Sequence, residues 1–198
     1  MPKLNEADRN ERRQRLIDAA WRCAARTGYR DITVDDVCAE AEASKGAFYV
    51  YFETKQDLLL ALLDDDSQQV DSEIEELEAQ KLTQAERLRR FTRWMLERGA
   101  DAARARVRAD LWVAALTDDQ VRARLSEAIE RRRAHLRAWV EAGVAEGELA
   151  DVPANALASV LLALSDGLLL HGAVDGSAFR WERVRTALGA ILAGLQAG

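Results

Sequence analysis

The chain has 198 residues, of which 48% are hydrophobic and 31% are charged, a composition typical of a soluble protein with one or two domains. The polar N-terminal segment MPKLNEADRNERRQ does not resemble a signal peptide, and the longest uncharged run, 152–165, is too short to span a bilayer. We therefore expect a cytoplasmic protein without a membrane partner, and the net charge of −6 argues, taken alone, against a nucleic-acid partner as well.

The charge is unevenly distributed along the chain. Residues 1–26 hold seven basic and four acidic side chains, which leaves this segment with a charge of +3. A basic segment of this kind is the electrostatic signature of nucleic-acid binding, although a solvated helix face has a similar composition. Its basic side chains are Lys3, Arg9, Arg12, Arg13, Arg15, Arg22 and Arg26.

Residue types that carry catalysis or bind metals are sparse. Two cysteines, Cys23 and Cys38, are too few for a disulfide framework, so we expect packed, reduced thiols and regard a redox role as the weaker alternative. The two histidines, His135 and His171, are far apart and lack metal-ligand spacing. No nucleophile–base pair or phosphate-binding glycine loop is evident. The sequence therefore predicts no metal, no cofactor and no enzymatic activity.

Helix-capping residues and apolar residues at helical spacing predict a chain made of helices. Thr33-Val-Asp-Asp36 and Thr54-Lys-Gln-Asp57 resemble capping boxes in which Asp replaces Glu, and Ser44 is a further cap between them. Gly28 is placed to end the first helix. The helices predicted in this part of the chain cover residues 7–27, 33–41 and 45–51, followed by a long helix from residue 54.

The remainder of the chain continues the helical pattern. Thr83-Gln-Ala-Glu86 and Thr117-Asp-Asp-Gln120 are capping boxes, and Pro153 is placed in the first turn of another helix. The fold class is therefore predicted to be all-α, with about nine helices and no strand. We place a domain boundary within the fourth helix near Leu60, giving domains 1–60 and 61–198. The later predicted helices include 104–116, 118–146, 153–174 and 178–195.

Residues 32–63 predict a helix-turn-helix followed by the start of a longer helix. Phe48 and Phe52 stand four residues apart, so both are expected to face the core. The opposite side of the same short helix is then free to enter the major groove of B-DNA, which is about 12 Å wide and admits one helix. The side chains expected to face outward are Lys45, Gly46, Ala47, Tyr49 and Val50.

These outward residues suit two kinds of DNA contact. Gly46 permits a close approach of the helix N-terminus to a phosphate, and Ala47 and Val50 suit apolar contact with a thymine methyl group. Hydroxyl and ammonium groups suit phosphate oxygens. The residues expected to contact phosphates in this way are Tyr49, Tyr51 and Lys55.

Residues 15–63 resemble the TetR family of bacterial one-component regulators, and the set of motifs is specific although it covers only about a quarter of the chain. The matching residues are Ala19-Ala20, Gly28-Tyr29, Thr33-Val34, the run Gly46-Ala47-Phe48-Tyr49-Val50-Tyr51-Phe52-Glu53-Thr54-Lys55 and Asp57-Leu58-Leu59. The resemblance implies that positions commonly in contact with DNA are occupied here by Thr33, Ser44, Lys45, Gly46, Tyr49, Tyr51 and Lys55.

Three positions depart from the family pattern. The usual turn Ala-Gly-Val-Ser is replaced by residues 41–44, in which Glu42 carries a Cβ and is poorly suited to a positive φ. We therefore expect a strained or differently shaped turn, with a negative charge near DNA. Val50 replaces a residue that is often aromatic or His, which removes one polar contact. Ala24 stands where the family packs a Phe, and Trp21 is expected to fill that space.

The last two helices are predicted to form a dimer interface because small residues let helices approach closely. The resemblance implies a four-helix interface across a two-fold axis, and the alternative is that these residues form the core of a monomer. The small residues are Ala156, Ser159, Ala163, Ala190, Ala193 and Gly194, surrounded by Leu161, Leu162, Leu188, Ile191 and Leu195.

The C-terminal domain is also predicted to bind a small molecule. Aromatic walls suit flat or cationic ligands, and carboxylates or His suit polar anchors. The alternative is that the tryptophans belong to the core and that the polar residues bond neighbouring helices. The candidate ligand-binding residues are Phe91, Trp94, Met95, Asp110, Trp112, Trp139, Asp166, Leu168 and His171.

These features together predict a DNA-binding transcriptional regulator, in particular a repressor that binds a palindromic operator in double-stranded DNA as a homodimer. A small-molecule inducer is expected to release it. Two recognition helices must then reach major grooves about 34–36 Å apart. The alternative is a helical interaction module whose DNA-binding head has decayed, and Glu42 and Val50 are the residues that support this alternative. A helical enzyme is a third reading, for which no catalytic constellation is found.

Overall fold

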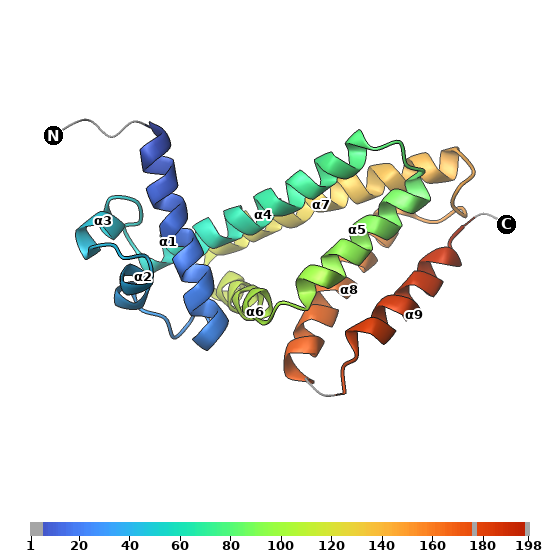
Figure 1. Ribbon diagram of the computed structural model, residues 1–198. Helices are drawn as coiled ribbons and strands as arrows, with labels where there is room; N and C mark the ends of the chain where they lie inside the picture. Colours follow the sequence, from blue (N-terminus) through green and yellow to red (C-terminus); the bar gives the residue numbers. More distant parts are fainter. Residues whose placement is uncertain (1–5, 176–177, 197–198) are drawn as a thin grey trace.

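The computed structural model describes residues 6–175 and 178–196, and within these ranges it contains nine α-helices and no strand beyond an isolated bridge between Leu149 and Gln196. The all-α prediction is therefore confirmed (Figure 1). Lys3, which belongs to the predicted basic segment, lies outside the described residues. The helices are α1 Glu6–Thr27, α2 Val34–Glu40, α3 Lys45–Tyr49, α4 Lys55–Ala79, α5 Gln84–Gly99, α6 Ala102–Thr117, α7 Asp119–Ala145, α8 Ala154–Val174 and α9 Trp181–Ala193.

The predicted capping boxes begin α2 and α4. The Thr33 side chain accepts the Asp36 amide at 3.1 Å, while Asp36 accepts the Thr33 amide at 2.7 Å. Thr54 and Asp57 repeat this arrangement, with distances of 3.1 and 2.8 Å. Each box satisfies two backbone donors that a helix N-terminus would otherwise leave free.

The predicted capping residue of α7 was wrong. The side chain that caps α7 is Asp118 and not Thr117, because the Asp118 carboxylate accepts the amides of Gln120 and Val121 at 2.9 and 3.0 Å. Thr117 instead ends α6 and donates its hydroxyl to the Ala114 carbonyl at 3.3 Å. A carboxylate is the stronger acceptor for a helix N-terminus, where the helix dipole favours negative charge. In addition, α3 ends at Tyr49, two residues before the predicted end.

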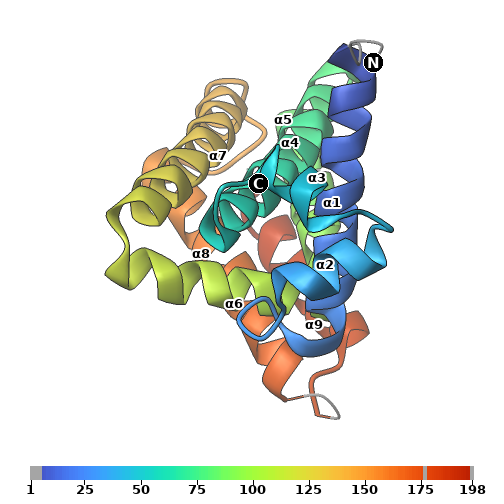
Figure 2. The same cartoon turned by 90° about the vertical axis from the view of Figure 1, so that its left-hand side faces the viewer.

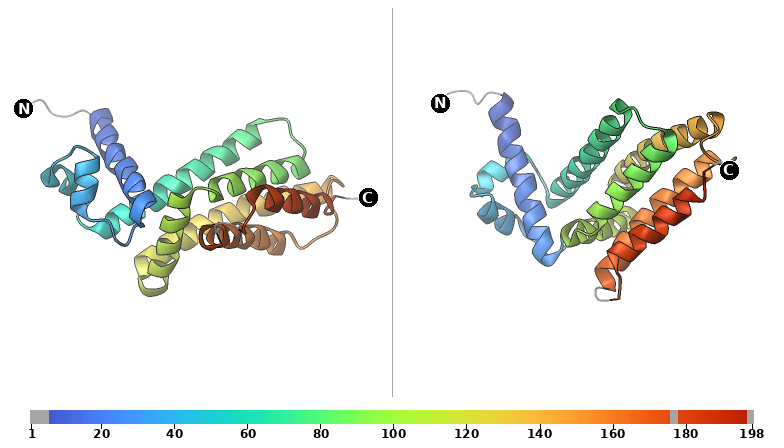
Figure 3. Two further views of the ribbon diagram at one scale, coloured as in Figure 1. Left: turned by 60° about the horizontal axis from the view of Figure 1, so that its bottom comes forward. Right: turned by 45° about the vertical axis from the view of Figure 1, so that its right-hand side comes forward.

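The helices form an N-terminal end, made of α1–α3, and a larger helical body. Figure 1 shows α1, α2 and α3 at one end, with α4 running from them into the body beside α7. Figure 2, which faces the α1–α3 end, shows α6 running sideways from α2 to the start of α7. In both views of Figure 3, α8 and α9 lie at the edge opposite α1–α3.

Two apolar cores hold these parts together. The first joins α1–α3 and the start of α4 to α6 and α7, and it includes Leu63, Val107 and Leu125. The second lies within the body and includes Phe91 and Trp139. Helices α6 and α7 therefore contribute apolar side chains to the core of the α1–α3 end. The division of the chain into domains 1–60 and 61–198 stays a prediction.

The apolar part of α8 is longer than the uncharged run 152–165, because the helix continues past Asp166 to Val174. Its 21 residues and mean hydropathy of 1.7 make it long and apolar enough to cross a membrane, judged by length and composition only. Only 17% of its most apolar window is buried within the chain. The exposed apolar face of α8 is therefore the kind of surface at which proteins interact with other molecules.

Candidate nucleic-acid interface and ligand cavity

Helix α3 is anchored by its two phenylalanines and exposes its opposite face. Phe48 is fully buried and Phe52 is 2% exposed, with ring centroids 5.4 Å apart, so their predicted inward orientation is confirmed. Tyr49 is 53% exposed and Val50 is 63% exposed. Ser44 caps the helix by accepting the Ala47 amide at 3.1 Å. The buried pair holds α3 in place, while the exposed side chains remain available to a DNA groove.

Helix α1 contributes arginines to the same surface. A cleft of about 280 Å³ lies between α1 and the helix-turn-helix, and its walls include Arg12 and Arg15 beside Ala47, Val50 and Tyr51. The sequence placed these arginines in a basic segment but did not assign them to the site. Their spacing of three residues, which puts them on one face of α1, was the signal that could have found them.

The turn between α2 and α3 has the strained conformation expected of Glu42. Its φ is +52°, and it is the one non-glycine residue with positive φ in the described part of the chain. The amides of Glu42 and Ala43 donate to the carbonyls of Ala39 and Cys38 at 3.3 and 2.9 Å. Backbone hydrogen bonds thus hold a side chain in a left-handed conformation that glycine adopts without strain.

Several residues predicted to contact DNA also have partners within the chain. The hydroxyl of Thr33 donates to Asp36 at 2.7 Å, and Lys45 forms an exposed ion pair with Asp35 at 2.7 Å. The Lys55 ammonium donates to the Arg30 carbonyl at 2.7 Å and lies 5.1 Å from the centroid of the Tyr29 ring. Burial lowers the pKa of Lys55. Lys55 therefore holds the segment before α2 in addition to any contact with DNA.

The candidate ligand residues do not gather in one cavity. Phe91 and Trp139 are buried in the second core, where Trp139 donates its indole N–H to Glu78 at 3.1 Å, and Trp94 stacks on Phe91. The remaining candidates differ in position: Trp112 and His171 are exposed, Leu168 is half-buried on α8, and Asp110 accepts the Arg30 amide at 3.1 Å. Met95 and Asp166 are the two candidates that line a small cavity among α1, α4, α5, α6 and α8.

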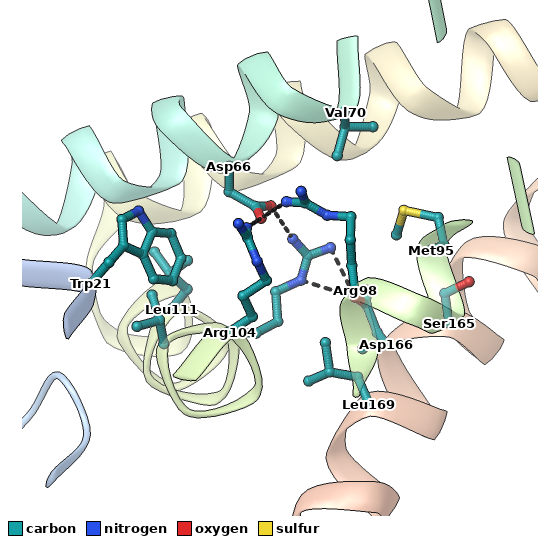
Figure 4. A pocket seen from close by; sticks show the side chains of 13 residues that line it. Trp21, Asp66, Val70, Met95, Arg98, Arg104, Leu111, Ser165, Asp166 and Leu169 are labelled. Carbon is teal, nitrogen blue, oxygen red and sulfur yellow. Dashed lines mark hydrogen bonds and ion pairs between the residues drawn. The ribbon is translucent and has the colours of Figure 1, made fainter. Parts of the chain in front are cut away.

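A small cavity of about 30 Å³ lies between α1, α4, α5, α6 and α8. Figure 4 shows Trp21 from α1 on one side, with the Asp66 carboxylate from α4 between the ends of the Arg104 and Arg98 side chains. Met95 and Leu169 provide apolar walls. Sequence reasoning found Asp166 but missed Asp66 and the arginines, because an arginine on a helix is usually solvated and only tertiary packing brings these side chains together.

One carboxylate in this cavity receives four arginines. Asp66 pairs with Arg98 at 2.5 Å, with Arg104 and Arg108 at 3.1 Å each, and with Arg132 at 3.3 Å. Burial alone would raise the pKa of Asp66, but the surrounding guanidinium charges outweigh it and hold this pKa below its usual value. We refer to these four residues, Arg98, Arg104, Arg108 and Arg132, as the arginine cluster.

Helix α6 connects the arginine cluster to the α1–α3 end. It carries Arg104 and Arg108 in the cluster, and between them Arg106 donates to the carbonyls of Ala25 and Arg26 at 2.6 and 2.9 Å. Neighbouring α4 makes a second connection, because Asp65 accepts the Trp21 indole N–H at 2.9 Å. Helix α6, which carries two arginines of the cluster, and α4, which carries Asp66, thus both also contact α1.

The described residues contain no group of three or more His, Cys, Asp or Glu side chains that is placed to bind a metal ion. Cys23 and Cys38 are buried, free thiols, and burial raises the pKa of both. A buried thiol with a raised pKa is a poor nucleophile at neutral pH.

Comparisons with known proteins agree with this arrangement. Residues 16–62 match the family model of the TetR-family bacterial regulatory proteins, and residues 84–197 match that of the C-terminal domain of BetI-type transcriptional repressors. The chain is also similar to the uncharacterized HTH-type transcriptional regulator YuxN of Bacillus subtilis strain 168, with 40% identity over 53 residues. That alignment spans 27% of this chain and only 18% of the length of YuxN.

Solved structures resemble this chain over nearly its whole length. Salmonella enterica GusR is 25% identical, with a TM-score of 0.74 and 98% of both chains covered. A putative transcriptional regulator from Saccharomonospora viridis, solved in complex with choline, shares the fold with a TM-score of 0.82 at 24% identity, with 96% of this chain and 99% of that chain covered. The match to the C-terminal family model alone spans more than half of the chain. The chain therefore belongs to the TetR family of bacterial regulatory proteins and is a DNA-binding transcriptional regulator.

Proposed function

We propose that this protein is a homodimeric repressor of the bacterial cytoplasm that binds a near-palindromic operator and is released by a small molecule. The observation that carries the proposal is the exposed face of α3, held by buried Phe48 and flanked by Arg12 and Arg15 of α1. The match of residues 84–197 to BetI-type transcriptional repressors supports repression. The family is one of transcriptional regulators, which supports a role other than catalysis.

The apolar face of α8 supports a dimer. Val160 is 59% exposed and Val174 is 89% exposed, and Ala156, Ala163 and Gly167 lie at helical spacing between or beside them. Ile191 gives α9 a similar exposed position. Three of the leucines predicted to surround the small residues of the interface, Leu161, Leu162 and Leu188, are already buried within the chain. A second copy covering α8 and α9 would remove the exposed stripe from water.

We infer that α6 transmits the ligand signal. Arg104 and Arg108 of α6 meet Asp66 and Asp166, while Arg106 and Asp110 of the same helix bond the backbone at the end of α1 and beyond it. A ligand that shifts α6 therefore changes the position of α1–α3 within each subunit. The spacing of the two recognition helices follows, and a coupling of about 1–3 kcal/mol lowers operator affinity by about 5–150-fold.

DNA binding is tested with Tyr49→Ala and Lys55→Ala in the full chain, measured on DNA upstream of the protein's own gene at increasing salt. We expect the unaltered protein to bind one fragment specifically, with an affinity that falls steeply as salt rises. Both variants should bind at least about tenfold more weakly, because each removes a contact to DNA, and both should remain dimers. Leu116→Ala and Lys81→Ala, at exposed positions away from α3, are the matched controls and should bind normally.

The alternative function is a helical interaction module with a decayed DNA-binding head. The strained Glu42, with its negative charge beside α3, is the observation that favours it. The same experiment separates the two functions. Absence of binding to every upstream fragment, even at low salt, would support the interaction module, and normal binding by both Tyr49→Ala and Lys55→Ala would show that α3 is not the reading helix.

A further inference from the structure

We propose that the ligand of this regulator is an organic acid whose carboxylate is bound by the arginine cluster and whose apolar part lies against α5 and α8. The proposal rests on the proposed function, because it names the chemical class of the molecule that would release the protein from DNA. Three features of the cavity support it, which are its charge, its unpaired donors and its apolar walls.

The cluster has more positive than negative charge. Four guanidinium groups form ion pairs with three carboxylates, which are Asp66, Asp166 and, at 3.6 Å from Arg104, Asp101, so an excess of one positive charge remains. Each oxygen of Asp66 already meets two arginines, and a carboxylate offers about four acceptor sites in all. Asp66 is therefore saturated. Uncompensated charge is costly to bury, so an additional anion would be stabilised here.

The most deeply buried arginine has donors without acceptors. The side chain of Arg132 is 1% exposed, and its Nε and Nη1 have no hydrogen-bond partner among the described residues. Its remaining nitrogen reaches Asp66 at 3.3 Å and Ser67 at 3.4 Å. A carboxylate that took over Arg98 and Arg104 would free Asp66 to bond Arg132 more fully. The arrangement thus gains hydrogen bonds when an anion enters.

The walls beside the cluster are apolar, which favours an organic acid over an inorganic anion. Met95, Leu111 and Leu169 line the cavity, and Trp21 is the one aromatic residue among its described lining residues. The cavity of about 30 Å³ has room for about one water molecule, so a ligand must part α5, α6 and α8 to enter. Such a movement acts directly on Arg104, which lies 5.2 Å from the centroid of the Trp21 ring.

A quaternary ammonium ligand does not suit this cavity. Recognition of such cations uses several aromatic faces without competing positive charge. The cavity instead presents one indole and an excess of guanidinium groups. The charge of the site therefore predicts discrimination against choline, the molecule bound to the similar protein from Saccharomonospora viridis.

The test is isothermal titration calorimetry of the full-length protein with hexanoate, octanoate, decanoate and benzoate. The amide of each acid is the neutral control of matched shape, and choline is the cationic probe. We expect at least one carboxylate to bind about tenfold or more tightly than its amide, because hydrogen bonds between charged groups are the stronger ones, and we expect no binding of choline. If no carboxylate exceeds its amide, or if choline binds, the proposal is wrong.

Two variants that change the charge of the cluster in opposite directions sharpen the test. Arg104→Gln, at the more exposed side of the cluster, should weaken carboxylate binding about tenfold, whereas Asp166→Asn should strengthen it, because a competing carboxylate is removed from Arg108. Arg89→Gln makes the same charge change as Arg104→Gln at an exposed position on α5 and should bind as the unaltered protein does. A loss of folding would weaken binding in both cluster variants, so only opposite effects support the proposal, and parallel effects contradict it.

The outcome is separable from that of the proposed function. Calorimetry needs no DNA. If a carboxylate binds but no upstream DNA fragment does, the ligand site is supported and the proposed repressor function is wrong. Specific DNA binding without carboxylate binding would leave the repressor standing and overturn the ligand class. Release of the operator by the same carboxylate that binds in calorimetry supports both.

Discussion

At the scale of single residues, Glu42 shows how a departure from a family pattern becomes a structural cost. The sequence predicts a strained turn because glutamate carries a Cβ, and the structure places Glu42 at a φ of +52°. A non-glycine residue in this region costs about 1–2 kcal/mol. The charge of Glu42 adds a separate penalty for DNA, since the side chain lies beside α3 at the cleft shared with Arg12 and Arg15.

Glu42→Gly is predicted to raise the free energy of unfolding by about 1 kcal/mol and to tighten DNA binding, because it removes both the strain and the charge. Glu42→Gln separates the two effects, since it removes the charge but keeps the Cβ. Urea unfolding and operator titration provide the measurements. The matched control is Glu146→Gly, at a C-cap with a φ of −83°, which should gain no stability. Equal stability of Glu42→Gly and Glu42→Gln would contradict the strain argument.

At the scale of elements, the attachment of α9 depends on close packing around one aromatic ring. A Cβ at Gly172 of α8 would lie 2.5 Å from the Trp181 ring, and one at Gly99 of α5 would lie 3.2 Å from it. Phe179 packs edge-on against the same ring, with centroids 4.9 Å apart. Trp181 thus lies against both α5 and α8 at the first residue of α9.

Gly172→Ala is predicted to lower the free energy of unfolding by about 1–3 kcal/mol, because the rigid indole must move to admit the methyl group. Gly189→Ala, within α9 and with open space around the added Cβ, is the control and should be neutral or slightly stabilising, since alanine is the better helix former. Urea unfolding compares the two. Equal stability of both variants would show that Trp181 adapts without cost.

At the scale of the whole molecule, the exposed stripe of α8 and the opposite position of α3 are complementary features. Figure 3 places α8 and α9 at the edge away from α1–α3, so a pair of subunits joined there leaves both recognition helices free for DNA. A single short helix offers few contacts. Joining two raises the overall affinity by about 10²–10⁴-fold through effective concentration when the spacing of the helices matches the DNA.

Val160→Glu is predicted to produce a monomer and to weaken operator binding by about 100-fold or more, because a charge in the apolar stripe opposes burial against a second copy. Val113→Glu is the matched control, since Val113 on α6 is exposed to a similar degree, at 61% compared with 59%. Sedimentation velocity and operator titration measure the two effects. A Val160→Glu protein that remains a dimer would place the interface elsewhere.

The sequence alone determined most of the helices and the exposed face of α3, because these depend on neighbours along the chain. Capping residues such as Thr33 and Thr54 act within one helical turn, and the spacing of Phe48 and Phe52 settles which face of α3 is buried. Asp118 shows the limit of this reasoning, since two capping residues in succession compete and only the local hydrogen bonds decide between them.

Only the tertiary structure decided where the charged residues of the body lie. Asp66 and Arg132 are far apart in the sequence, and each lies among other charged residues, as solvated positions of a helix usually do. Packing α4, α5, α6 and α7 around one point places four guanidinium groups on a single carboxylate, with Asp166 of α8 as the second acid. Helical periodicity records which face of a helix is apolar, but it carries no information about which distant polar side chains will share a buried site.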